Sequence, residues 1–245
     1  MTGSVFSQIL PILSAPLLSR IYSPSDYGIL GIYMGLTSLF TLVSTLQYAG
    51  AIIVAKNEDE VNGLIKMSLK ILLIYTFSVL LLTFTFSDFI QLQLNTPGLN
   101  KWLWLSPFSI CMNGLYTIFS NYAIRHKYYS LVSKYRIISS IGTTFFSILI
   151  GYLYKSTSGL FIGLCAGQLI NGVLFTIMVI NKSDSLWNRI IVANTLNLKK
   201  QYISFPTYSL PAGFINTFIN QIPLFMLNTH ASSVAVGNFN MANRV

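Results

Sequence analysis

The chain has 245 residues, of which 53% are hydrophobic and only 9% are charged. Soluble domains carry roughly 25% charged residues, so this composition excludes soluble enzymes and soluble nucleic-acid-binding proteins. The net charge of +9 comes from cations in short loops between apolar segments, a pattern that indicates membrane topology and no nucleic-acid partner.

Seven segments lack Asp, Glu, Lys and Arg: 1–19, 27–55, 71–87, 102–124, 137–154, 156–181 and 201–243. Since a helix of about 20 apolar residues crosses a bilayer, they predict an all-α polytopic membrane protein. The expected spans are 3–21, 29–54, 71–87, 102–124, 137–154, 160–180 and 207–229, with the start of an eighth helix after Gly237. Because a helix that ends inside the membrane leaves backbone groups unsatisfied, we expect this sequence to be truncated at its C-terminus.

The loop cations predict the orientation of the chain. With the N-terminus inside, alternating the spans places eleven Lys and Arg residues in inner loops and three, Arg20, Lys101 and Lys155, in outer loops. Short cytoplasmic loops carry the excess of positive charge. We therefore expect a cytoplasmic N-terminus.

A weak internal repeat predicts two bundles. A shift of 209 residues aligns Ser23 with Ser232 and Gly28 with Gly237, each just after a long span. Parallel repeats of this kind occur in transporters built from two six-helix halves. We expect a first bundle over 1–206, with a cytoplasmic linker at 182–206, and the start of a second bundle over 207–245.

Residues for catalysis or metal binding are sparse. The six acids all lie outside the spans, and we interpret Glu58-Asp59-Glu60 as a solvated loop cluster. His126 and His230 have no paired ligand or nucleophile in the sequence, and the two cysteines, Cys111 and Cys165, are interpreted as buried small hydrophobic residues. We expect no enzyme activity, no metal and no cofactor.

Neutral polar residues recur at helical spacing in three spans. Because amides facing lipid are costly, such stripes point toward other helices or a wet cavity. Hydrogen bonding between helices explains any one stripe, whereas three stripes together favour a polar central pathway. The stripes are Tyr33, Thr37, Thr41, Ser44 and Tyr48, then Asn113, Thr117 and Asn121, and then Asn216, Asn220 and Gln221.

Two further features concern packing and charge. Gly159, Gly163 and Gly167 repeat every four residues and predict a face for close helix packing. Arg20 and Arg244 are the basic residues nearest the membrane. Arg20 either snorkels to the interface or serves the pathway. Arginine suits a diphosphate because its planar fork donates paired hydrogen bonds.

Three strings carry a resemblance to a known family. The first runs from Gln8-Ile9-Leu10-Pro11 through Pro16-Leu17-Leu18-Ser19-Arg20-Ile21-Tyr22-Ser23-Pro24-Ser25-Asp26-Tyr27-Gly28. It resembles the opening of bacterial polysaccharide flippases of the O-antigen or Wzx type, in the multidrug/oligosaccharidyl-lipid/polysaccharide exporter superfamily. Ala51 to Glu60 and Val236 to Arg244 are similar to that family's end of span 2 and start of span 8.

The resemblance implies a two-bundle transporter of the bacterial inner membrane, with a fold like that of the multidrug exporters. Such proteins move undecaprenyl-diphosphate-linked oligosaccharide to the periplasmic leaflet, surrounded by membrane lipids and accompanied by a polysaccharide polymerase and a chain-length regulator. It implies that Arg20 and Arg244 meet the diphosphate and that the polar stripes face the sugars. The chain departs from the family at Gln47-Tyr48-Ala49-Gly50, where many relatives carry Arg-Tyr-Glu.

Two alternatives stay open at this stage. A multidrug or cation antiporter of the same superfamily would need an acid in the spans, and none is present. An integral-membrane polysaccharide polymerase or glycosyltransferase would need a large catalytic loop, whereas the predicted outer loops are short.

Overall fold

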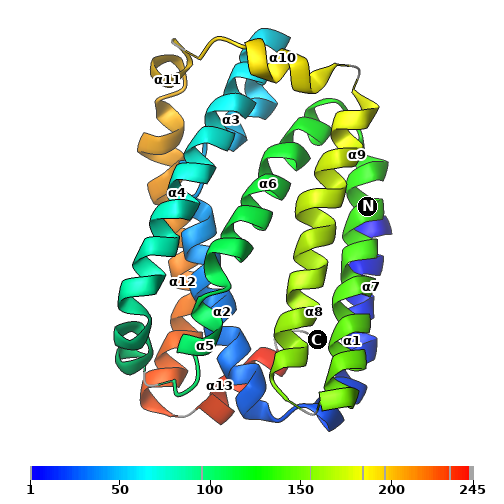
Figure 1. Ribbon diagram of the computed structural model, residues 1–245, viewed down its shortest axis with the longest axis vertical. Helices are drawn as coiled ribbons and strands as arrows, with labels where there is room; N and C mark the ends of the chain where they lie inside the picture. The colour runs from blue at the N-terminus through cyan, green and yellow to red at the C-terminus, as the bar shows by residue number, and fades with distance from the viewer. Residues whose placement is uncertain are drawn as a thin grey trace.

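The computed structural model describes residues 2–94, 96–154, 156–183, 185–195, 197–231 and 233–242, and these residues form helices and turns without β-strands. The long helices run along one axis and form a single bundle (Figure 1). In chain order the helices are α1 (Thr2–Ile21), α2 (Pro24–Val43), α3 (Tyr48–Val54), α4 (Glu58–Gln93), α5 (Asn100–Leu103), α6 (Ser106–Arg125), α7 (Tyr129–Tyr154), α8 (Ser158–Leu169), the π-helix η1 (Ile170–Leu174), α9 (Phe175–Lys182), α10 (Leu186–Val192), α11 (Leu198–Gln201), the π-helix η2 (Phe205–Ser209), α12 (Leu210–His230) and α13 (Ser233–Ala242).

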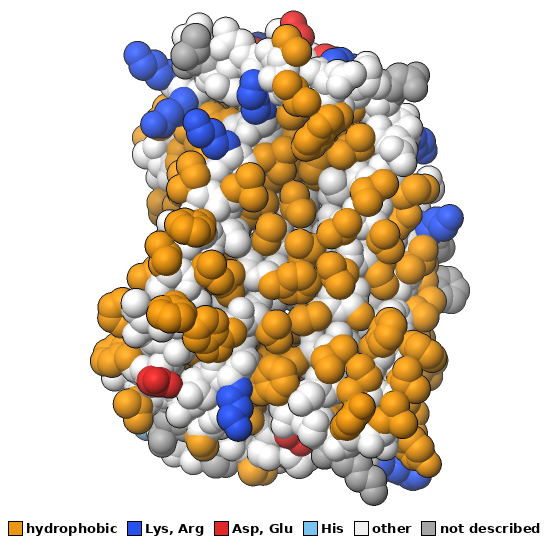
Figure 2. Space-filling view, viewed as in Figure 1, with side chains coloured by type: hydrophobic (Ala, Val, Ile, Leu, Met, Phe, Trp, Pro, Cys, Tyr) orange, Lys and Arg blue, Asp and Glu red, His pale blue; other side chains and the backbone are white. Residues whose placement is uncertain are grey.

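The surface of the bundle is that of a membrane protein. Hydrophobic side chains cover the visible face between its two ends, and charged side chains gather mainly toward the ends (Figure 2). The fold is therefore an all-α polytopic membrane protein, as predicted, while the number of crossings stays a prediction. Five helical stretches of the described chain are long and apolar enough to cross a membrane: Pro24–Val43, Glu58–Gln93, Tyr129–Tyr154, Ser158–Lys182 and Phe205–His230.

The two ends of the bundle are distinguished by their connections. We call the end that carries α10 and α11 the linker end, and the opposite end, where Tyr22 and Ser23 connect α1 to α2, the turn end (Figure 1). At the turn end, α2 begins with a capping box. The Ser23 backbone N–H donates to Asp26 Oδ2 over 2.9 Å, and the Asp26 N–H donates to Ser23 Oγ over 3.3 Å. This satisfies backbone donors that a helix start leaves free.

The segment predicted as one span over 29–54 consists of two helices. α2 ends at Val43, and the chain turns through Leu46 and Gln47, whose φ angles are +48° and +60°, before α3 begins. The Gln47 side-chain amide donates to the Leu42 carbonyl over 3.4 Å. A side chain thus reaches one of the carbonyls that the end of α2 leaves without a helical partner.

Other helices divide a predicted span or extend beyond it. The span over 102–124 is divided into α5 and α6, and Pro107 lies in the first turn of α6, where a missing N–H costs no hydrogen bond. α4 and α7 begin earlier than the charge-free segments because helices continue beyond the apolar core with Lys66, Lys70 and Lys134 on their sides.

Close packing at the glycine repeat of α8 is confirmed. A Cβ atom at Gly163 would overlap Ser147 Oγ of α7, and one at Gly167 would overlap Thr143 Oγ1. At Gly159 the overlapping atom is the Tyr22 hydroxyl oxygen, which donates its proton to the Ser147 carbonyl over 2.6 Å. The absence of a Cβ atom at these three glycines of α8 therefore lets α7 and α8 approach closely.

The internal repeat has a counterpart in space. Under the shift of 209 residues, the end of α1 corresponds to the end of α12 and the start of α2 to the start of α13. A Cβ atom at Gly28 would overlap the Ser233 carbonyl, and one at Gly237 would overlap the Pro24 carbonyl. Since Pro24 and Ser233 are equivalent under the shift, the two crossings are reciprocal. α2 and α13 are thus related by a local pseudo-two-fold arrangement.

The linker is fixed to the start of α4. The Tyr202 hydroxyl donates to Glu60 Oε2 over 2.6 Å, and Lys66 Nζ donates to the Ile191 carbonyl over 2.6 Å and the Ala193 carbonyl over 3.0 Å. Burial, together with the bond to Glu60, raises the pKa of Tyr202. The acids predicted as a solvated loop instead form the first turn of α4, where negative charge is favourable.

Candidate functional site

Two adjoining cavities form a polar hollow in the bundle. Their volumes are about 300 Å³ and 350 Å³, and they share Ser38 of α2 and Asn113 of α6. We call the two together the polar groove. Its hydroxyl and amide lining is Thr37, Ser38, Thr41, Thr45, Gln47, Asn113, Thr117, Ser139, Thr143, Gln168 and Asn171.

α2 contributes hydroxyl groups from successive turns. The Thr37 hydroxyl donates to the Tyr33 carbonyl over 2.9 Å, and Ser38 Oγ donates to the Gly35 carbonyl over 2.7 Å. Each hydroxyl keeps its oxygen lone pairs as acceptors. Thr41 Oγ1 is buried and has no hydrogen-bond partner in the described chain. This wall therefore offers acceptors and one unused hydroxyl.

The opposite wall contains Gln168 of α8 and Asn171 of η1, two amides that the polar stripes predicted from the sequence do not include. Asn171 Nδ2 donates to Ser139 Oγ over 2.8 Å, while Asn171 Oδ1 is buried without a hydrogen-bond partner among the described atoms. Asn171 lies in the π-helix η1, a distortion that is frequent at functional sites. A usable signal was present, because Gln168 and Asn171 are amides within an otherwise apolar span.

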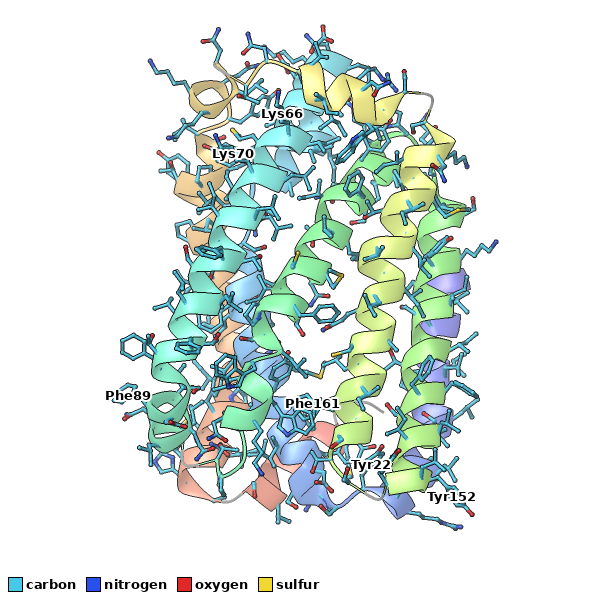
Figure 3. All side chains as sticks on the ribbon, in the orientation of Figure 1. Tyr22, Lys66, Lys70, Phe89, Tyr152 and Phe161 are labelled. Carbon is cyan, nitrogen blue, oxygen red and sulfur yellow. The ribbon has the colours of Figure 1, made fainter. Side chains whose placement is uncertain are left out.

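On the side that faces the turn end of the bundle, the groove is followed by an aromatic cluster formed by Tyr33, Trp102 and Phe161. The rings of Trp102 and Phe161 stack with centroids 4.0 Å apart, and the Tyr33 ring meets Phe161 edge-on at 5.0 Å. Phe161 lies in the interior of the bundle (Figure 3). The Tyr33 hydroxyl donates to Ser109 Oγ over 2.6 Å, and Ser109 Oγ donates to Gln168 Oε1 over 2.8 Å. Aromatic packing and a hydrogen-bond chain thus join α2, α5, α6 and α8 here.

A further cavity extends the hollow toward α1. It has a volume of about 300 Å³ and shares Met34, Thr143 and Leu164 with the polar groove. Pro11 and Ser14 line its far side, so the hollow reaches from α1 to the end of α2.

The structure brings together only part of the predicted α2 stripe. Thr37 and Thr41 line the groove, whereas Tyr33 belongs to the aromatic cluster. Ser44 Oγ donates to the Thr41 carbonyl over 2.6 Å, and the Tyr48 hydroxyl donates to the Lys199 carbonyl over 3.3 Å. The break between α2 and α3 interrupts the continuous face, so these last two residues have structural partners instead.

The other two stripes also divide. Asn113 and Thr117 line the groove, but Asn121 Nδ2 donates to the Ala49 carbonyl over 2.9 Å and joins α6 to α3. Asn216 and Asn220 are exposed on α12. Gln221 also lies outside the groove, because its side-chain oxygen is close to Gly35, on another face of α2. The α12 stripe therefore does not meet the other two stripes.

Of the two candidate arginines, Arg20 lies among the described residues and Arg244 does not. Arg20 is exposed in the last turn of α1, at the turn end and outside the polar groove. Arg244 lies outside the described residues. The described residues that line the groove are all uncharged.

Titratable groups in the described chain do not form a metal site, since no group of three or more His, Cys, Asp or Glu residues gathers there. His126, for which the sequence suggested no paired ligand or nucleophile, lies beside a carboxylate of α4. Its Nε2 lies 3.3 Å from Glu58 Oε2, and Arg125 lies 3.7 Å from the other carboxylate oxygen. These contacts join the end of α6 to the start of α4 at the linker end, outside the polar groove.

Comparison with known proteins places this architecture in a family. The family described as polysaccharide biosynthesis protein matches residues 17–245, which include every residue of the polar groove. No curated protein and no solved structure matches the chain. The match covers most of the sequence, and the chain belongs to the polysaccharide biosynthesis protein family.

Proposed function

We propose that the protein is a flippase of the Wzx type, which moves undecaprenyl-diphosphate-linked oligosaccharide across the bacterial inner membrane by alternating access. The observation that carries the proposal is the polar groove, a set of uncharged amides and hydroxyls inside a membrane bundle of a polysaccharide biosynthesis family. Sugars present hydroxyls that both donate and accept hydrogen bonds, and these groove side chains complement them.

The groove chemistry favours sugar over the alternatives. A cation antiporter and a glycosyltransferase both require a carboxylate at the site, and the described groove lining contains none. We assign Thr37, Thr41, Asn113, Gln168 and Asn171 to the oligosaccharide. The protein would carry out no covalent step, so it is a transporter without enzyme activity.

The orientation follows from the loop cations. A cytoplasmic N-terminus places the linker end in the cytoplasm and the aromatic cluster toward the periplasm. In this arrangement the groove receives sugar from the cytoplasmic side, and separation of Trp102 from Phe161 would release it. Arg20, at the periplasmic end, would then meet the diphosphate as it leaves.

The test compares binding of two lipids to the purified full chain. One is undecaprenyl diphosphate carrying an oligosaccharide, and the other is the same lipid without sugar. The proposal predicts that Asn113→Leu weakens binding of the sugar-bearing lipid about fivefold, the equivalent of one hydrogen bond of about 1 kcal/mol, and leaves the bare lipid unchanged.

Asn216→Leu is the matched control, because this asparagine is exposed on α12 outside the groove. The same variants are expressed in a strain that lacks its flippase, and surface polysaccharide is measured. Equal binding of both lipids by every variant, with no rescue of the strain by the wild type, would overturn the proposal.

A further inference from the structure

An apolar crevice opens between α2 and α4, on a different face of α2 from the polar groove. Its volume is about 350 Å³. Its floor contains buried Val79 and Leu103, and its rim contains exposed aromatic side chains. Phe86 and Phe89 of α4 and Phe40 of α2 form that rim, and Figure 3 shows Phe89 at the outer edge of the bundle.

The interior of the crevice does not suit a polar ligand. Thr83 lies on the floor, but its hydroxyl donates to the Leu80 carbonyl of its own helix over 3.0 Å. The remaining lining is mostly apolar, from Leu36 and Phe40 of α2 to Leu82 and Ile90 of α4, so a hydrocarbon chain suits the crevice.

The length and level of the crevice identify the source of that chain. From Val79 to Ile90, α4 rises about 16 Å, and one leaflet contributes roughly half of the 30 Å hydrocarbon core. Polar side chains begin at the end of the crevice nearest Ile90, where Asn100 Nδ2 donates to Asp88 Oδ1 over 3.0 Å and Lys101 is exposed. Trp104 is exposed beside Phe84 of α4, and exposed tryptophans are typical of a membrane interface.

We propose that this crevice holds one acyl chain of a phospholipid from the leaflet at the turn end. Its mouth opens on the exposed apolar face of α4, so the bilayer itself supplies the ligand. The phospholipid headgroup lies beside Lys101 and Asp88, whose opposite charges match those of a zwitterionic headgroup. The bound acyl chain fills the space between α2 and α4. Without it, the side chains that line this space lose packing contacts across a void.

The test is native mass spectrometry of the full chain extracted in mild detergent. The wild type is expected to retain one phospholipid. Thr83→Phe places a ring on the floor of the crevice and is expected to lower the retained fraction at least fivefold. Thr85→Phe is the matched control, because Thr85 is an exposed threonine of the same helix outside the crevice, and it is expected to retain the lipid.

A second variant separates loss of the lipid from loss of the fold. Phe86→Ala removes an exposed part of the rim, and it is expected to lower retention with an unchanged elution volume on size exclusion. Equal retention by the wild type, Thr83→Phe and Phe86→Ala would overturn the proposal. Replacement of the retained phospholipid by added undecaprenyl phosphate at equal concentration would also overturn it, because it assigns the crevice to a different lipid.

Discussion

Thr41 allows a direct test of whether the polar groove serves a ligand. Its Oγ1 is buried without a hydrogen-bond partner in the described chain, and it lines the groove. An unsatisfied buried hydroxyl costs about 1–3 kcal/mol, so Thr41→Val is expected to stabilise the protein by about 1 kcal/mol. For a chain of this length that raises the melting temperature by about 2–4 °C.

The same change is expected to impair transport. If a sugar hydroxyl pairs with Thr41 during transport, its loss removes about 1 kcal/mol of binding, or roughly fivefold in affinity. The assays are thermal unfolding of the purified full chain and surface polysaccharide in a strain without its own flippase. A more stable variant that transports less is the signature of a site that keeps an unpaired group for its ligand.

Thr176→Val is the matched control. Thr176 of α9 also has a buried Oγ1 without a partner among the described atoms, but it does not line the groove. We expect the same gain in melting temperature and unchanged transport. Full transport by the Thr41→Val protein, together with the gain in stability, would refute the reasoning. So would an equal loss of transport in both variants, since the effect would then not depend on the groove.

The remaining predictions concern packing, the linker and charge. Gly237→Ala is expected to lower the melting temperature by several degrees, because overpacking costs about 1–3 kcal/mol. Gly50→Ala is the control: its new Cβ atom would meet only ordinary contacts at 3.5 Å, so we expect no fall in the melting temperature. Tyr202→Phe is expected to cost about 1 kcal/mol near neutral pH. The fold raises the pKa of Tyr202 above its ordinary value of 10.0. The hydroxyl therefore contributes fully to stability below the ordinary pKa of 10.0, and this contribution is lost as the pH rises through the higher pKa of the folded protein. The free energies of unfolding of wild type and variant should therefore converge at alkaline pH. Arg20→Gln is expected to lower surface polysaccharide without a change in melting temperature, and equal polysaccharide would assign Arg20 to the interface alone.

Hydropathy predicted the fold class but not the interruptions of its helices. The charge-free segment 27–55 has no proline, and its one glycine near the break, Gly50, lies inside α3. The break at Leu46 and Gln47 lies beside a contact with a distant element, the hydrogen bond from Tyr48 to the linker. Such tertiary contacts leave no periodic signal in the sequence.

The polar stripes show a similar limit. Helical spacing correctly grouped Thr37 with Thr41 and Asn113 with Thr117, because spacing determines which residues share a face. It gave no information on what that face meets. Asn121 continues the α6 stripe but binds the Ala49 carbonyl, since α3 crosses α6 at that level. Gln168 of α8 and Asn171 of η1 were not predicted to line the groove, because the glycine repeat before them indicated helix packing alone.

The arrangement around α2 connects these observations to the transport that we propose. One face of this helix presents Thr37, Ser38 and Thr41 to the polar groove, and another presents Leu36 and Phe40 to the apolar crevice. α2 therefore lies between a polar groove that we assign to the sugar and an apolar crevice that we assign to an acyl chain of a bilayer phospholipid. A change in its tilt would alter both compartments together, and its crossing with α13 at Gly28 and Gly237 is so close that tilting would move α13 as well.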